Sequence, residues 1–279
     1  MSGLQVVEVA QWQGSGAATA LRLREGAARL AELIPSARRR AVSLDDGAGK
    51  ARGGVENADV LQRHLQAVRA ALAEVPDGDL TVIVGGDCAV DLAPVGAALS
   101  AFWNRLALVW FDAHADLNSP QPSPSGASHG KVLRALIGDG PEGLRPAQSL
   151  PAQRVVLAGA RSLDPGERDL LWRRSIRHLG VEQLAGPGPL LDAVRATGAE
   201  AVYAHIGLDV LDPQIFPAVG TPEPGGLGVE ELLAAVRALA DEFTLAGVAL
   251  TEYEPTDNTD PEEAVLQRIV DGLFRPAPS

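Results

Sequence analysis

The chain has 279 residues, of which 46% are hydrophobic, and a formal net charge of −12. This length suits one α/β domain spanning residues 1–279, and no apolar run reaches the roughly 18 residues that predict a membrane span. The negative charge argues against a nucleic-acid or anionic-membrane partner. Because Cys88 is the sole cysteine, an internal disulfide is excluded. A reducing compartment, the cytoplasm, is therefore expected, and the N-terminal residues predict no signal peptide.

Short runs of β-branched and aliphatic residues alternate with longer amphipathic stretches. The expected strands are Leu4–Val9, Arg40–Leu44, Leu80–Val84, Leu106–Asp112, Arg154–Ala160, Ile176–Leu179, Ala201–Asp209 and Leu245–Glu252. The expected helices are Ala17–Leu33, Asn57–Glu74, Val90–Trp103, Lys131–Ile137, Pro165–Arg173, Pro189–Thr197, Glu230–Glu242 and Pro261–Leu273. This near-regular alternation predicts a parallel sheet with helices on both faces.

Two long loops, 118–130 and 216–228, follow strands that end in aspartate-rich segments. Ligands of open α/β sheets bind beyond the carboxyl ends of the strands. We therefore expect the functional site at these strand ends.

The stretch VWFDAHADLN (109–118) carries the sharpest chemical signal. Asp112, His114 and Asp116 are spaced by two, so they share one side if the extended backbone continues. Carboxylates and imidazole at the end of a buried strand are unfavourable without a partner, and a divalent cation would supply one. A polar strand end is the alternative, but a second aspartate-bearing strand end favours a metal site.

That second strand end, AHIGLDVLDP (204–213), contains an unexpected glycine. His205, Gly207 and Asp209 point the same way along a strand, so a gap separates two potential ligands. Glycine weakens a strand interior, so either the space is needed or a side chain has been lost.

The turn VIVGGDCAVD (82–91) contains two further candidates. Asp87 precedes a helix and is expected to be its N-cap. Cys88 is either a small buried hydrophobe or, if exposed where the other ligands gather, a thiolate ligand.

Several other polar residues occupy loops, strand ends or helices. His129 precedes a helix and suits proton transfer. Asp164 occupies a helix-cap position, and His64 is expected on an exposed helix without a role. Glu252 and Glu254 end the last strand, where they either bind a cation or are solvated.

Seven segments occur in the order and spacing typical of the arginase/agmatinase (ureohydrolase) family. They are GGDCAVD, FDAHADLN, SGASHG, GARSLDPGE, LDVLDP, FPAVGTPEPGGL and TEYEP. The resemblance covers nearly the whole chain. It implies a three-layer α/β/α fold around an eight-stranded parallel sheet, a homo-trimer or homo-hexamer, and two Mn²⁺ ions at the strand ends. In such enzymes the ions supply the nucleophile that attacks a guanidino carbon and releases urea.

Carried over to this chain, the resemblance assigns Asp112, His114, Asp116 and Asp209 as metal ligands. It also assigns Cys88, where most of the family has histidine. Asp112 would bridge both ions, and Asp116 also belongs to the expected catalytic set. Gly207 stands where the family has the second bridging aspartate, so the resemblance interprets the gap as a lost ligand.

The resemblance also assigns residues around the substrate. His129 matches the proton-shuttle histidine and Glu252 the acid that faces the guanidinium. Substrate binding falls to Asn118, Ser125 and Asp164. Ala127 replaces an asparagine that contacts the α-carboxylate in arginases, so strict arginine specificity is not expected.

Four hypotheses remain open at this stage. The first is an active amidinohydrolase with a weakened metal cluster, including an enzyme like the N-hydroxyarginine amidinohydrolases. The second is a single-metal hydrolase, and the third is a non-catalytic binding subunit. The fourth is an active enzyme that carries a variant Gly207. We favour a hydrolase of a small guanidino compound with one ion or partial occupancy. That ion is Mn²⁺, or alternatively Zn²⁺, held by Asp112, His114 and Asp209.

Overall fold

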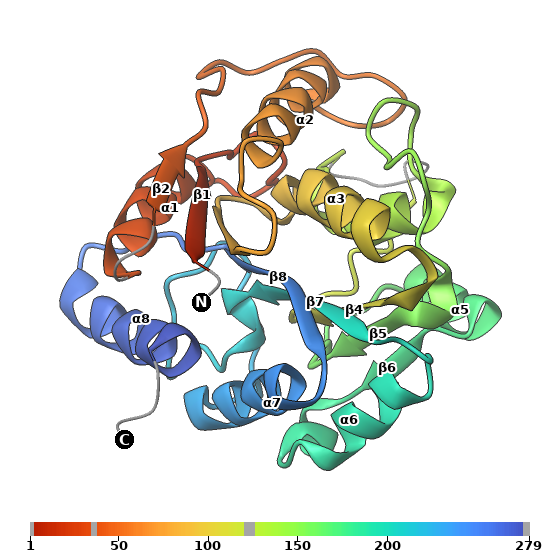
Figure 1. The fold of residues 1–279 in the computed structure, drawn as a ribbon. Helices are drawn as coiled ribbons and strands as arrows, with labels where there is room; N and C mark the ends of the chain where they lie inside the picture. Colours follow the sequence, from red (N-terminus) through yellow and green to blue (C-terminus); the bar gives the residue numbers. More distant parts are fainter. Residues whose placement is uncertain (1–2, 35–37, 120–125, 276–279) are drawn as a thin grey trace.

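Eight strands form one parallel sheet in a computed structural model that describes residues 3–34, 38–119 and 126–275. The sheet order is β2-β1-β3-β8-β7-β4-β5-β6, with helices packed on both faces (Figure 1). This architecture confirms the expected three-layer α/β fold. No helix among these residues is long and apolar enough to cross a membrane.

Most expected elements are present, with small shifts at their ends. The strands are β1 (Leu4–Val9), β2 (Arg38–Ala41), β3 (Leu80–Gly85), β4 (Leu106–Phe111), β5 (Val155–Ala158), β6 (Arg177–Leu179), β7 (Ala201–Gly207) and β8 (Thr244–Thr251). The helices are α1 (Arg22–Leu33), α2 (Ala58–Leu72), α3 (Leu92–Phe102), α4 (Val132–Arg134), α5 (Pro165–Arg174), α6 (Gly188–Arg195), α7 (Val229–Glu242) and α8 (Thr259–Phe274).

Two hydrophobic cores lie on opposite faces of the sheet. One packs α2, α3 and α5 against strand residues such as Leu108 and Trp110. The other packs α1, α6, α7 and α8 against the alternate strand residues, such as Val109 and Phe111. The central strands β4 and β7 are buried along their whole length, which explains their continuous apolar sequences.

The helix expected over Lys131–Ile137 is interrupted. Its α-helical part is a single turn, α4, and a wider turn follows over Ala135–Asp139. Within that turn Gly138 has φ +98, a value that side-chain-bearing residues rarely adopt. The glycine therefore ends the helical backbone directly after Ile137, where the helix was expected to end, but the last part of the expected span is wider than an α-helix.

The sequence predicted His64 on an exposed helix, but its side chain is only 1% exposed. Its Nε2 accepts the Asp45 backbone N–H at 3.0 Å, and its Nδ1 faces Gln11 Oε1 at 3.1 Å. Since Nε2 is an acceptor, the ring is neutral and Nδ1 donates. Burial lowers the pKa of His64 below its usual value.

The buried neutral His64 makes folding stability depend on pH. The unfolded chain binds this proton more readily, so stability decreases as pH falls below about 6.5, by at most about 1.4 kcal/mol per pH unit for one proton. His64→Gln should remove this component, which is measured as the difference between variant and unsubstituted urea-unfolding curves at several pH values. A pH-independent difference would contradict the assignment.

Candidate metal centre and active site

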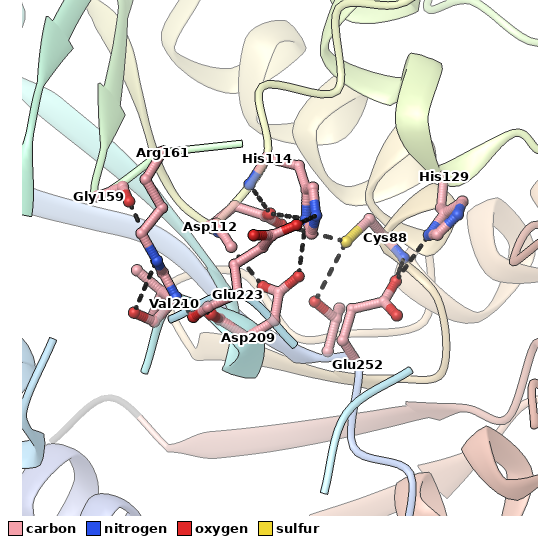
Figure 2. Close-up of polar contacts among 12 residues, drawn as sticks. Cys88, Asp112, His114, His129, Gly159, Arg161, Asp209, Val210, Glu223 and Glu252 are labelled. Carbon is pink, nitrogen blue, oxygen red and sulfur yellow. Dashed lines mark hydrogen bonds and ion pairs between the residues drawn. The ribbon is translucent and has the colours of Figure 1, made fainter. Parts of the chain in front are cut away.

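Four neighbouring strands carry the candidate residues at their carboxyl ends. Cys88 follows β3, Glu252 follows β8, Asp209 follows β7 and Asp112 follows β4. These strands are adjacent in the order β3-β8-β7-β4. Because all four are parallel, their carboxyl ends meet at one edge, where Figure 2 shows the side chains gathered.

Asp112, His114 and Asp209 form one compact set, the Asp112 group. One ligand atom from each lies within 4.8 Å of the others. His114 Nδ1 is 3.0 Å from Asp209 Oδ2 and 3.3 Å from Asp112 Oδ1. Asp112 Oδ1 also accepts the His114 backbone N–H at 2.7 Å. These atoms can therefore coordinate a common cation.

The spacing predicted that Asp116 shares one strand face with Asp112 and His114, but the strand does not continue that far. Strand β4 ends at Phe111, and Asp116 has a left-handed φ of +51. The turn nevertheless directs Asp116 into the cavity lined by the Asp112 group. Its Oδ2 is buried without a hydrogen-bond partner among the described residues.

Opposite charges perturb the pKa values of Asp112 and His114 in opposite directions. Burial opposes the charged form of His114, but the carboxylates of Asp112 and Asp209 outweigh it and raise its pKa to about 12. Burial likewise disfavours the Asp112 anion, but the imidazoles of His114 and His205 hold its pKa well below the usual range. Cationic partners thus keep Asp112 ionised.

The other acidic groups have an excess of negative neighbours. Burial and the Asp112 charge raise the pKa of Asp209 to about 6, and the same two causes raise that of Asp116. Burial, then Glu252 and Asp112, raises the pKa of the Cys88 thiol. The cavity therefore has more buried carboxylates than cations to neutralise them, which favours binding of a metal cation.

Cys88 combines features of both expected alternatives. It is only 2% exposed, like a core residue, but it lines the same cavity. Its Sγ lies 3.5 Å from Asp112 Oδ2 and 3.7 Å from Thr251 Oγ1. The preceding Asp87 accepts the Ala89 backbone N–H, as expected of an N-cap.

His129 and Glu252 face each other across the cavity, with His129 Nδ1 3.5 Å from Glu252 Oε1. The same oxygen accepts the Cys88 backbone N–H at 2.9 Å. Burial opposes both charges, but their mutual attraction raises the pKa of His129 and lowers that of Glu252. Glu254 is not solvated but 3% exposed, and burial raises its pKa.

The candidate substrate-binding residues line the outer part of the cavity. Asn118 Nδ2 donates to Asp164 Oδ2 at 3.1 Å, and both residues line the cavity with Ala127. The Asp164 backbone N–H donates to Glu167 Oε2 at 2.9 Å, so Glu167 holds the start of α5. Ser125 lies outside the described residues.

Two further contributors were not assigned from the sequence. His205 was recognised as a potential ligand but omitted from the predicted site; its Nε2 lies 3.6 Å from Asp112 Oδ2. Its position two residues before Gly207 on β7 was the available signal. Arg161 donates to the backbone carbonyls of Asp209 (2.9 Å) and Glu223 (2.7 Å) (Figure 2). It therefore ties together two parts of the 209–224 segment.

The donor set fits a divalent metal ion. Carboxylates and imidazoles converge within coordination range, and two buried donor atoms, Asp116 Oδ2 and His205 Nε2, lack hydrogen-bond partners in the described part of the chain. Unpaired buried polar atoms are unfavourable, and coordination would satisfy them.

Comparison with known proteins places this arrangement in context. Residues 11–271 match the arginase family. Arginase from Staphylococcus aureus strain COL is 30% identical over 226 residues, covering 76% of this chain and 74% of that protein. Arginase from Bacillus caldovelox is 31% identical over 245 residues, covering 81% of each. The chain belongs to the arginase family.

Solved structures of similar proteins show the same fold. Entamoeba histolytica arginase in complex with L-ornithine superposes with a TM-score of 0.88 at 22% identity, covering 99% of this chain and 100% of that one. Proclavaminate amidino hydrolase from Streptomyces clavuligerus has a TM-score of 0.71 at 22% identity, covering 98% and 90%.

Arg161 should stabilise this arginase-family site through its backbone contacts. Arg161→Met leaves the carbonyls of Asp209 and Glu223 without their charged donor, so we expect a loss of about 2 kcal/mol or more in the free energy of unfolding. Chemical denaturation measures this loss, and Arg145→Met at an exposed position is the control. Equal stabilities of the two variants would contradict a structural role for Arg161.

Proposed function

We propose that this chain is a metal-dependent amidinohydrolase that cleaves a C–N bond of a small guanidino compound and releases urea. The observation that carries the proposal is the Asp112 group at the floor of a cavity also lined by His129 and Glu252. The cavity volume is about 220 Å³. That is below the range of about 300–1,000 Å³ typical of drug-sized sites, so the cavity suits a small substrate.

Asp112, His114 and Asp209 would hold the metal ion, with Asp116 as a further donor on the cavity wall. When bound, a divalent ion lowers the pKa of a coordinated water and orients the scissile group. Mn²⁺ suits the carboxylate-rich Asp112 group. The proposal includes impaired turnover with Mn²⁺, because Gly207 offers no oxygen donor beside Asp112.

His129 and Glu252 would act on the substrate itself. Glu252 is a buried carboxylate whose negative charge favours a guanidinium, and His129 is within reach to donate a proton to the departing amine. Asn118, Asp164 and Ser125 would bind the far end of the substrate. Since Ala127 has no polar side chain, recognition of an α-carboxylate there is weakened, which favours related guanidino compounds as well as arginine.

The proposed assembly is a homo-trimer or homo-hexamer in the cytoplasm. Trp172 and Trp103 are 82% and 57% exposed, so both side chains are available for contact with a second copy. Sedimentation velocity should give a mass three or six times the 29.0 kDa of one chain.

Urea release tests the proposed activity. We expect urea from at least one of arginine, agmatine, guanidinobutyrate and N-hydroxyarginine when the protein is loaded with Mn²⁺ or Zn²⁺. His129→Asn should lower kcat about 10²–10⁴-fold, as loss of a general acid does. His178→Asn, at a histidine that does not line the cavity, should retain activity. Loaded protein that releases no urea from any of these substrates would contradict the function.

Gly207→Asp tests whether this position impairs the site. Gly207 has φ −72, which any residue adopts, but a Cβ there would lie 2.5 Å from Asp112 Oδ2, so the Asp112 carboxylate must rotate. The added carboxylate should raise Mn²⁺-supported urea release by about 10-fold or more. Gly207→Asn, of equal size but uncharged, is the control; equal activities in both would show that charge at 207 is not the missing element.

A further inference from the structure

A second set of donors, the Cys88 group, lies on the other side of Asp112 from His114. It comprises Cys88, Asp112 and His205, whose ligand atoms also lie within 4.8 Å of one another. All three residues are buried, with exposures of 2%, 1% and 0%. The two groups share only Asp112.

His205 is held in an orientation that directs Nε2 toward Asp112. Its Nδ1 lies 2.6 Å from Asp91 Oδ2, and the other oxygen of Asp91 accepts the Tyr203 hydroxyl at 2.8 Å. The ring stacks on Trp110 with 3.4 Å between centroids. When Nε2 gives up its proton to make way for a metal ion, Nδ1 still donates to Asp91 and Nε2 directs its lone pair toward Asp112. A carboxylate behind a histidine is the arrangement typical of metal-ligating imidazoles.

His205 Nε2 has no hydrogen-bond partner within the described residues, although it is completely buried. It lies 3.6 Å from Asp112 Oδ2, and Cys88 Sγ lies 3.5 Å from the same oxygen. Donor atoms around one tetrahedral zinc ion are roughly 3.3–3.5 Å apart, given the usual zinc–ligand bond lengths. The two distances to Asp112 Oδ2 are close to this range, and Cys88 Sγ and His205 Nε2 lie within 4.8 Å of each other.

Gly207 allows this position of the Asp112 carboxylate. A Cβ at residue 207 would lie 2.5 Å from Asp112 Oδ2, the oxygen that faces both Cys88 and His205. With glycine, that oxygen occupies the space that a side chain would fill. The missing side chain at 207 and the imidazole at 205 therefore belong to one local arrangement.

We propose that His205 is a metal ligand and that Cys88, Asp112 and His205 form a zinc-binding subsite beside the Asp112 group. The donors are one sulfur, one oxygen and one imidazole nitrogen, a combination that favours Zn²⁺ over Mn²⁺. On binding, the Cys88 thiol and His205 Nε2 each release a proton to solvent, so that sulfur coordinates as the thiolate and His205 as neutral imidazole. This deepens the proposed function, and it replaces the partial occupancy expected from Gly207 alone with two unlike subsites.

Cobalt substitution tests the subsite directly. The metal-stripped protein is titrated with Co²⁺, and bound metal is counted by elemental analysis while the near-ultraviolet sulfur-to-cobalt charge-transfer band is recorded. We expect the band to saturate at one Co²⁺ per chain and Zn²⁺ to displace that ion. Bound Co²⁺ without the band would overturn the proposal.

Two independent variants separate the ligands. Cys88→Ser should abolish the band. His205→Asn retains a donor for Asp91 but removes Nε2, so it should weaken the band-forming Co²⁺ by about 10–100-fold or more. His178→Asn, an exposed histidine on β6, is the matched control and should behave like the unsubstituted protein.

Unchanged Co²⁺ affinity in a folded His205→Asn variant would overturn the proposal. It would show instead that His205 is an imidazolium paired with Asp91 and Asp112. If His205→Asn does not fold, two other measurements decide: the band in Cys88→Ser, which should be lost, and zinc X-ray absorption of the unsubstituted protein. Imidazole among the ligands of the thiolate-bound zinc supports the subsite. Its absence overturns the subsite. Urea release without the band rejects the subsite alone, whereas the band without urea release rejects only the function.

Discussion

The burial of Asp112 at the carboxyl end of a central strand is the constraint on which the site depends. This carboxylate is 1% exposed and lies among Asp116, Asp209 and Glu252, all buried as well. A charged carboxylate leaves water only when cations and donors surround it. His114 and His205 supply that charge in the structure, and a metal ion bound between them would supply more.

The arrangement around Asp112 has two sides with different chemistry. Its Oδ1 faces His114, and through it Asp209, on the loops that follow the strands. Its Oδ2 faces Cys88 and His205, both of which are shielded from solvent. Gly207 offers no oxygen donor, and it leaves the space that lets Asp112 contact this second side. The proposed impairment with manganese and the proposed zinc subsite therefore rest on the same geometry.

Much of the fold could be predicted because buried parallel strands need continuous apolar runs. β1 was predicted to the residue, and the other strands were each displaced by a few residues at most. Predictions failed where local pattern and tertiary environment disagree. His64 lies on a helix with a polar-looking position but is buried against the N-terminal segment. The helix expected over Lys131–Ile137 is α-helical for only one turn, because the backbone widens over Ala135–Asp139, where Gly138 has a φ of +98.

Among the candidate residues, chemistry was visible in the sequence, but proximity was not. Asp112 and His114 are neighbours in the chain, so their joint action follows from local spacing. Asp209 is close to them only because β7 pairs with β4, and the order of strands in the sheet is not contained in their order along the chain. The sequence left open whether the Glu254 side chain is solvated, because a strand end is often exposed. In the structure the 216–220 loop covers this side chain.

The sequence by itself determined the residue types and the alternation of strands and helices, which depend on composition and local periodicity. That a carboxylate is missing at position 207 is what the family resemblance implies. Only the tertiary structure decided that β3, β8, β7 and β4 are neighbours, that His205 Nε2 faces Asp112, and that Arg161 holds the loop after β7. The physical reason is that contacts between distant segments are set by how the apolar faces pack, and local periodicity does not specify that packing.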